Sequence, residues 1–518
     1  MCIPKSVPSS LSSSTLSPIK SVPESTMATL LTMPLELLVA VSTHISTSDL
    51  ASLRLTCKQV EKSLYEWFSE EFFTKKQFML THPSLQALID ISKHVGFSKK
   101  LKHVIIATNV YRSIPLRFRD EHAAARYAQG YEAQEALLST GIDREMLTEA
   151  FQNLVNLHTV GIRDFNAPSR LRDGQHATWT SWGATTVMKE TGMELCFYDR
   201  NGSGPERGGP FLCRVFSTVN YALGKAGRTP PELEVLLRKA GLPDITFSLP
   251  DFLLSSLVPV LNNYTSLLLN VDLTLNHLHT HTGGTIVETH AGHSLRQFLS
   301  FTPNLTHLRL NFQKSLVVNN TDFLDWLGQS VPIPGQKSAN HLSIPPTTFP
   351  LLKTLELGQL KILPDTLLAV IAKFAPSLHS ISLWRMALCS RSLPPQGHKP
   401  SYWAELLRRM GKIPQLNLNH LKVGMVQQDY MYAVSMHVNF KKEEDSEGIG
   451  SKQVEYHGKN MDKFLDSLIG RVNVEWPKEE EVVSSGEDSD DSMADPDHED
   501  DDSEDEYEND NDEGSDDD

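Results

Sequence analysis

The strongest constraint on the fold is a recurring pattern of apolar residues spaced as L-x-x-L-x-L. The last two apolar positions alternate with other residues, which places them on one face of a short β-strand. The pattern occurs at Leu157-x-x-Val160-x-Ile162, Leu305-x-x-Leu308-x-Leu310, Leu352-x-x-Leu355-x-Leu357, Leu378-x-x-Ile381-x-Leu383 and, more loosely, Leu418-x-x-Leu421-x-Val423. A sixth strand is predicted at Leu267, Leu269 and Val271.

Three of these strands follow a segment with helical periodicity. The predicted helices are Leu295 to Phe301, Leu367 to Phe374 and Tyr402 to Met410. Leu355 and Ile381 are 26 residues apart, within the range of about 20–29 residues for a leucine-rich repeat. Repeats of this kind stack because each unit buries its neighbour's apolar face. We therefore expect a mixed α/β fold with an irregular, leucine-rich-repeat-like solenoid, and the alternative is an irregular α/β domain whose strands alternate by coincidence.

Other segments interrupt or precede the repeats. Helices are predicted at His82 to Val95, Asp120 to Ser139 and Asp143 to Leu154, and a strand at Leu101 to Ala107. Residues 166–209 are rich in Gly and contain Trp179 and Trp182, and we interpret them as a long insertion. Long irregular loops also carry binding surfaces, so a binding role for this segment is the alternative. The polar segment Lys441 to Lys452 is expected to end the fold, with a final helix and strand between Tyr456 and Trp476 as a cap.

The segment from Met33 to Phe73 predicts three short helices. Pro34 suits a first helical turn, and Ser46 with Asp49 has the serine-x-x-acid spacing of a helix start. Thr56 and Gln59 repeat that capping spacing. Apolar residues recur at helical spacing in all three helices: Leu37, Leu38, Val41, Ile45, Leu50, Leu53, Val60 and Leu64. About 40 residues bury too little surface to be stable alone, so another surface is expected to cover part of them.

This segment resembles an F-box. The resemblance rests on Met33-Pro34-Leu35-Glu36-Leu37-Leu38, followed by Asp49-Leu50, Leu53-Arg54 and Cys57-Lys58. It departs from the family pattern at Met33, where leucine is usual, and at Gln59-Val60, where an arginine and an aromatic residue are usual. The resemblance implies a three-helix F-box that binds a Skp-type adaptor. The residues carried over to that contact are Pro34, Leu35, Leu38, Leu50, Leu53 and Leu64.

The resemblance continues beyond the helices. Phe72 to Met79, Ser84 to Ser92 and Leu101 to Ala107 are similar to the segment that follows the F-box in a large family of fungal F-box proteins. This similarity implies a fungal source. It also implies a subunit of an SCF-type cullin–RING ubiquitin ligase, in which the repeats recognise a protein substrate.

The net charge of −16 is concentrated at one end of the chain. Residues 479–518 hold 23 of the 64 acidic residues and no Lys or Arg, which leaves 41 acidic against 48 basic residues elsewhere. A block of like charge with few apolar residues is expected to be disordered. The Ser/Pro-rich start is also expected to be disordered. The predicted divisions are thus a leader at 1–26, an F-box at 27–75, a helical linker with the repeat domain at 76–476, and an acidic tail at 477–518.

The sequence favours a binding protein over an enzyme. It contains no nucleophile elbow and no phosphate-binding loop, so we expect no catalytic residues and no cofactor. The alternating His277, His279 and His281 could bind zinc on a strand, but a structural loop is favoured because no complete ligand set follows. Basic residues form no stripe with interleaved aromatic residues, so we expect no binding to nucleic acid, and no membrane span is expected.

Five scattered cysteines fit reduced thiols in the cytoplasm or nucleus. The leading hypothesis is a substrate-recognition subunit of a ubiquitin ligase. The alternative is an adaptor-independent scaffold, or a protein that binds basic partners such as histones through its acidic tail. A third hypothesis is a hydrolase whose active site cannot be recognised from the sequence.

Overall fold

The computed structural model describes residues 30–113, 116–168, 173–174, 178–197, 210–273, 280–282, 285–287, 290–313, 317–330, 344–390, 398–430, 435–441 and 450–476. The chain divides into two units, Met1–Glu475 and Trp476–Asp518, and every described helix and strand belongs to the first. The predicted leader, the acidic tail, His277 and His279 lie outside the described residues. No helix among the described residues is long and apolar enough to cross a membrane.

The N-terminal part contains three α-helices, as the sequence predicts. After the short helix η1 (Leu30–Thr32) come α1 (Leu35–His44), α2 (Thr47–Leu55) and α3 (Lys58–Phe73), and both α1 and α2 pack against α3. The Ser46 hydroxyl accepts a hydrogen bond from the Asp49 amide and caps α2, as predicted. The second predicted cap is wrong, because Thr56 donates its hydroxyl back to the Leu53 carbonyl and α3 begins after Cys57. We call residues 30–73 the helical head.

Most described strands join one main sheet, which has eleven strands in this part of the chain. Along the strand order β1-β2-β3-β6-β8-β11-β12-β14-β16-β19 every pairing is parallel except the last, and β7 pairs beside β8. The bounds are β1 Lys75–Met79, β2 His103–Ala107, β3 Thr159–Arg163, β6 Glu232–Leu236, β7 Leu242–Pro243, β8 Ser266–Asp272, β11 His307–Phe312, β12 Thr354–Gly358, β14 Ser380–Trp384, β16 His420–Gly424 and β19 Gln453–His457.

All six predicted repeat strands lie in this sheet, as β3, β8, β11, β12, β14 and β16. Their alternating apolar side chains are buried, as Leu355 and Leu357 of β12 illustrate. The neighbouring residues of β12, Thr354 and Glu356, are partly exposed. From β6 to β16 one face of the sheet is therefore the core and the other meets solvent, whereas β3 is buried on both faces.

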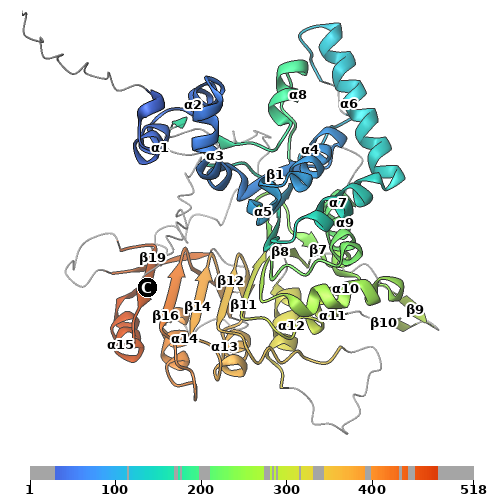
Figure 1. Ribbon diagram of the computed structural model, residues 1–518. Coiled ribbons are helices and arrows are strands. Elements are labelled where there is room, and N and C mark those ends of the chain that lie inside the picture. Colours follow the sequence, from blue (N-terminus) through green and yellow to red (C-terminus); the bar gives the residue numbers. More distant parts are fainter. Residues whose placement is uncertain are drawn as a thin grey trace, which may run out of the picture. The chain divides into compact units, whose positions relative to one another are not determined.

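Parallel strands require a crossover, and helices supply most of them. Figure 1 shows α12, α13 and α14 along strands β11, β12, β14 and β16. Successive helices pack on one another, from α4 through α7 and α9 to α10, and from α12 through α13 and α14 to α15. The bounds are α4 His82–Lys93, α5 Phe97–Lys100, α6 Glu121–Thr140, α7 Ile142–Asn153, α9 Pro210–Ala226, η3 Asp244–Phe247, α10 Asp251–Asn263, α11 His293–Ser300, α12 Val317–Gly328, α13 Pro364–Phe374, α14 Tyr402–Met410 and α15 Met461–Arg471. The mixed α/β architecture with a parallel-rich sheet is confirmed and is consistent with a solenoid.

A repeated turn ends three consecutive strands. Gln359, Arg385 and Met425 follow β12, β14 and β16, and each has a positive φ between 51° and 56°. Each turn amide donates to a carbonyl of the following strand or segment: Gln359 to Trp384 at 2.9 Å, Arg385 to Gly424 at 3.0 Å and Met425 to Lys452 at 2.8 Å. A conformation that is uncommon outside glycine thus recurs at one position of three repeats. Beyond these turns lies a second sheet, with the order β13 Lys361–Ile362, β15 Ala387–Ser390, β17 Gln427–Tyr430, β18 Met436–Phe440 and β20 Val472–Val474.

The segment after the helical head adds two strands to the main sheet: β1, which was not predicted, and β2, which matches the strand predicted at Leu101 to Ala107. Beyond Lys452, α15 and β20 are the helix and strand predicted between Tyr456 and Trp476, and the unpredicted strand β19 pairs antiparallel with β16. The predicted insertion contains β4 (Ala167–Pro168), β5 (Thr178–Trp179) and α8 (Ala184–Thr191). It lies against β1, where the Trp182 amide donates to the Gln77 carbonyl at 2.8 Å. A separate hairpin pairs β9 (Thr280–Thr282) with β10 (Thr285–Val287).

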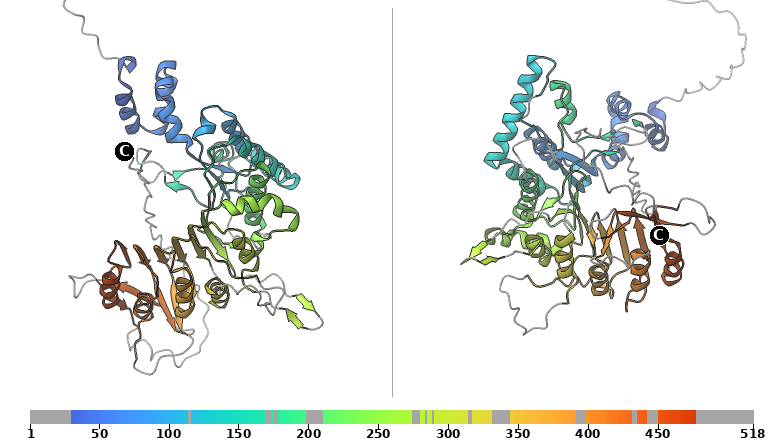
Figure 2. Two further views of the ribbon diagram at one scale, coloured as in Figure 1. Left: turned by 60° about the horizontal axis from the view of Figure 1, so that its bottom comes forward. Right: turned by 180° about the vertical axis from the view of Figure 1, so that it is seen from behind.

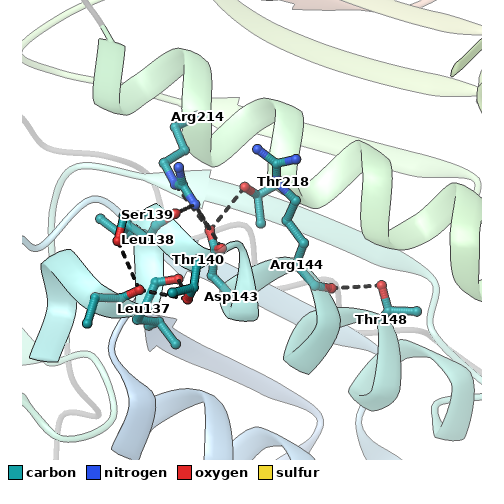
Figure 3. A network of polar contacts seen from close by, with 10 residues as sticks. Leu137, Leu138, Ser139, Thr140, Asp143, Arg144, Thr148, Arg214 and Thr218 are labelled. Carbon is teal, nitrogen blue, oxygen red and sulfur yellow. Dashed lines mark hydrogen bonds and ion pairs between the residues drawn. The ribbon is translucent and has the colours of Figure 1, made fainter. Parts of the chain in front are cut away.

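A buried carboxylate joins helices of the first half. Asp143, in the first turn of α7, has a fully buried side chain. Arg214 of α9 contacts it at 2.8 Å, and the Thr218 hydroxyl donates to it at 3.3 Å (Figure 3). Arg214 also donates to the Leu138 carbonyl near the end of α6. A buried charge needs such partners, so this network fixes α9 against the α6–α7 corner.

Candidate interaction surfaces

The helical head exposes apolar side chains that its own core leaves uncovered. Leu37 and Val41 of α1 are 56% and 44% exposed, and Leu55 at the end of α2 is 86% exposed. Leu31 and Leu35 add 49% and 48% at the entrance to α1. Leu37 and Val41 are four residues apart and therefore neighbours on one helix face. Clustered apolar exposure of this kind marks interaction sites.

The six residues carried over from the resemblance fall into two groups. Pro34 and Leu35 are exposed at the start of α1. Leu38, Leu50 and Leu64 are buried between the helices, and Leu53 is partly buried against the same core. The sequence also placed Leu37 and Leu38 on one apolar stripe, but only Leu38 faces the core. Leu31, Leu37, Val41 and Leu55 were not among the site predictions, because apolar spacing alone does not show which apolar residues of a helix face the core.

The helical head is attached to the following domain by side-chain contacts. The Asp173 carboxylate accepts hydrogen bonds from the amide and the hydroxyl of Thr47, both at 2.7 Å, at the start of α2. Phe73 at the end of α3 stacks on Phe97 with ring centroids 3.9 Å apart. Within the head, the Arg54 guanidinium lies 3.5 Å from the centre of the Phe68 ring. These contacts leave the exposed face of α1 uncovered by any described residue.

The solvent-facing side of the main sheet carries a row of polar residues in register. Along the main strand order, one residue of each strand pairs with one residue of the next strand, and these residues form the first row. A second row lies two residues away on each strand. We call the two rows together the polar face. The first row is Lys75, His103, Thr159, Glu232, Ser266, His307, Thr354, Ser380, His420 and His457. The second row includes Glu234, Arg309, Glu356, Ser382, Lys422 and Glu455.

At the β2–β3–β6 end, acidic residues are paired with their neighbours. The Thr159 hydroxyl donates to Glu232 at 2.7 Å, and Arg163 contacts Glu234 at 3.2 Å. The Nε2 atom of His103 lies 3.5 Å from Glu234, which is too long for a good hydrogen bond. Burial, helped by the charges of Lys75 and Arg163, lowers the pKa of His103 well below its usual value. His103 is therefore a neutral side chain at pH 7.

Two groups of the same composition occur further along the polar face. In the first, Ser266 Oγ lies 3.3 Å from His307 Nδ1, and His307 Nε2 lies 2.7 Å from Glu356. In the second, Ser380 Oγ lies 2.7 Å from His420 Nδ1, and His420 Nε2 lies 2.8 Å from Glu455. A cation accompanies each carboxylate: Arg309 at 3.8 Å from Glu356, and Lys422 at 3.3 Å from Glu455.

Both carboxylates are held in their ionised form. Burial alone would raise the pKa of Glu356, but the hydrogen bond with His307 and the charge of Arg309 outweigh it and lower that pKa. The pKa of Glu455 is lowered in the same way, against burial, by His420 and Lys422. The polar face therefore presents paired charges and hydroxyl groups, which suits it to hydrogen bonding with a protein partner.

Comparisons with known proteins do not assign the chain to a family. No family model matches it, and no curated protein matches it. A solved structure described as that of the Rad7 and Elc1 complex in yeast is 11% identical, with a TM-score of 0.20, and the match covers 74% of this chain and 87% of that chain. A likeness at this TM-score carries no argument about fold or function.

Proposed function

We propose that this chain is a substrate-recognition subunit of an SCF-type cullin–RING ubiquitin ligase. The observation that carries the proposal is a three-helix head with exposed apolar residues, placed directly before a sheet of repeated strands. The sequence order from Met33 to Lys58 resembles an F-box, and its apolar core of Leu38, Leu50 and Leu64 supports that reading. The chain would act by binding alone, without covalent chemistry.

The adaptor surface is the exposed apolar side of the helical head. A Skp-type adaptor would cover Leu31, Leu35 and Leu37 together with Val41 and Leu55, while Pro34 fixes the start of α1. Burying a fully exposed leucine or valine side chain is worth about 1.5–3 kcal/mol, so covering one that is half exposed contributes roughly half as much. Several such side chains provide a stable contact even after the costs of association.

The substrate surface is the polar face of the main sheet. Its hydroxyl, imidazole and charged side chains are in register and partly exposed, so an extended row of hydrogen-bonding groups meets the partner. A substrate held there and an adaptor held at the head belong to one complex. Tethering raises the effective concentration of substrate near the ubiquitin carrier, which is the mechanism that the proposal needs.

Co-purification of the full-length chain with a fungal Skp-type adaptor tests the proposal. The wild-type chain is expected to form a one-to-one complex. Leu37→Asp combined with Val41→Asp places two charges on the exposed face of α1 and should weaken binding at least 100-fold. Phe252→Asp is the matched control, because Phe252 is 81% exposed on α10, outside the head. It should bind the adaptor as the wild type does.

Two results would refute the assignment. One is a folded wild-type chain that binds no adaptor at high concentration. The other is a Leu37→Asp and Val41→Asp variant that binds as tightly as the Phe252→Asp control. Circular dichroism of both variants checks that the charges leave the fold intact.

A second candidate function follows from the charge of the C-terminal tail. Residues 479–518 contain 23 acidic residues and no Lys or Arg, which would attract basic proteins such as histones. Under this alternative the chain is an adaptor-independent scaffold. Deletion of residues 479–518 separates the two candidates: adaptor binding survives in a ligase subunit, whereas partner binding is lost in a tail-dependent scaffold.

A further inference from the structure

The last two strands of the polar face bring three metal-binding side chains together. His420 lies on β16, and Glu455 and His457 lie on β19. Glu455 and His457 are two residues apart in a strand, so they point to the same face. His420 stands directly opposite His457 in the antiparallel pairing of the two strands. Register, rather than proximity in the sequence, therefore creates this group.

The candidate ligand atoms converge. One oxygen of Glu455, Oε1, lies 2.8 Å from His420 Nε2 and 3.2 Å from His457 Nε2. All three atoms lie within 4.8 Å of one another. The two imidazole rings are stacked with centroids 4.0 Å apart and an angle of 12° between their planes. Because the stacked rings have nearly parallel lone pairs, the exposed His457 side chain must change rotamer before both imidazoles can bind one ion.

We propose that His420, Glu455 and His457 bind a divalent transition metal ion, with Zn²⁺ the best match. Two imidazoles and one carboxylate form a ligand set that Zn²⁺ takes readily, in a tetrahedral arrangement with one further position. The side chains are 20%, 35% and 69% exposed, so the fourth position faces solvent. Water or a donor atom from a bound protein would occupy it. The site would bind its ion whether or not the helical head binds an adaptor.

The surroundings of His420 favour a ligand role. Its Nδ1 atom lies 2.7 Å from Ser380 Oγ. In the tautomer that binds an ion through Nε2, the Nδ1–H group would donate a hydrogen bond to that hydroxyl. Histidines that bind metals commonly make such a second hydrogen bond, which fixes the ring. Lys422 acts in the other direction, because its ammonium group lies 3.3 Å from the second oxygen of Glu455 and repels a cation.

The other Ser–His–Glu group provides an internal control. His307 and Glu356 have nearly the same geometry, with 2.7 Å between Nε2 and Oε1. The residue that matches His457, opposite His307 on the next strand, is Thr354, whose neutral hydroxyl is not among the usual Zn²⁺ ligands. Arg309 takes the place of Lys422. The two groups share a sheet and differ in one ligand, so only the β16–β19 group should bind an ion tightly.

Titration of Zn²⁺ into chelator-treated, tag-free, full-length protein tests the site by calorimetry. The wild-type chain should bind one tight equivalent that His457→Ala loses or weakens at least 10-fold. His307→Ala should leave that equivalent unchanged. Lys422→Gln removes the repelling charge and should strengthen binding several-fold.

The Lys422→Gln variant distinguishes a metal site from an ion-pair network. If the group served only to pair charges, this substitution would not improve Zn²⁺ binding. Unchanged binding in His457→Ala, equal loss in His307→Ala, or weaker binding in Lys422→Gln would each overturn the assignment. Thermal unfolding without metal should be nearly unchanged in His457→Ala, because that side chain is 69% exposed, whereas His307→Ala removes the partner of Glu356 and should lower stability.

Discussion

The helical head and the polar face present opposite kinds of surface. The head leaves Leu55 largely exposed and Leu37 and Val41 about half exposed. The polar face pairs its charges internally, as His307 with Glu356 and His420 with Glu455. A partner at the head gains free energy by covering apolar surface. A partner at the polar face must replace existing hydrogen bonds, so it gains selectivity more than affinity. We therefore predict a contact of high affinity and low selectivity at the helical head, and a more selective contact at the polar face.

The largest expected effect separates core from surface within the head. Leu64 is fully buried, whereas Leu37, on the adjoining helix, is largely exposed. Leu64→Ala should lower the free energy of unfolding by about 3 kcal/mol through the cavity that it leaves. Leu37→Ala should change it by less than about 0.5 kcal/mol. Hydrogen exchange of the α1–α3 amides in the full-length chain measures both.

Adaptor binding sharpens this prediction. Leu37→Ala should weaken adaptor binding while amide protection stays at the wild-type level. A Leu37→Ala variant that loses protection as Leu64→Ala does would show that Leu37 belongs to the core, and the contrast between surface and core in the head would be lost.

The next effect concerns the paired carboxylates of the polar face. The pKa of Glu356 is lowered in the folded chain, so the folded state favours the ionised form. Its stabilisation is complete above the ordinary glutamate pKa and is lost as pH falls through the lowered folded value. Glu356→Gln should cost about 1.5 kcal/mol at pH 7. The difference from wild type should shrink as pH falls below the ordinary glutamate pKa, which urea unfolding at a series of pH values would reveal.

A partly buried cation behind the sheet should give a rise in stability with pH of the same sign, but in the alkaline range. Burial lowers the pKa of Lys373 on α13 to about 8, and its amine donates to the Leu327 carbonyl at 2.7 Å. Between pH 8 and 10.5 the unfolded chain binds more protons at this residue, so stability rises with pH. The rise should be about 1 kcal/mol after allowance for solvent screening. Lys373→Met should remove this rise, and equal pH dependence in both proteins would contradict the assignment.

The sequence predicted most strands and helices that bury one face, because burial of one face requires apolar residues at a regular spacing. Each L-x-x-L-x-L segment became a strand, and Tyr402 to Met410 is the helix α14 as expected. The strand β6 (Glu232–Leu236) was missed because Pro230 occupies the first apolar position of the pattern, although Leu233 and Val235 alternate as in the other strands. The strand β19 was missed because its residues are half-exposed at the end of the sheet.

The candidate sites were harder to predict, for a physical reason. The residues of the polar face occupy the variable positions between apolar ones, and their partners are set by strand register. His420 and Glu455 are 35 residues apart in sequence and come together only through the pairing of β16 with β19. In the head, Leu37 and Leu38 look alike in sequence, but the packing of α1 against α3 buries only Leu38.

The smallest expected effect compares two caps that the sequence makes equivalent. Ser46 and Thr56 each stand three residues before an acid or amide, Asp49 and Gln59. Only Ser46 accepts a bond from the amide three residues on, so Ser46→Ala should cost about 1 kcal/mol. Thr56 instead donates to the carbonyl of Leu53, so Thr56→Ala should cost less than about 0.5 kcal/mol. Thermal unfolding with hydrogen exchange on α2 and α3 measures the difference. Equal costs would mean that Thr56 also caps its helix in solution, and that the spacing rule was a better guide than the observed contact.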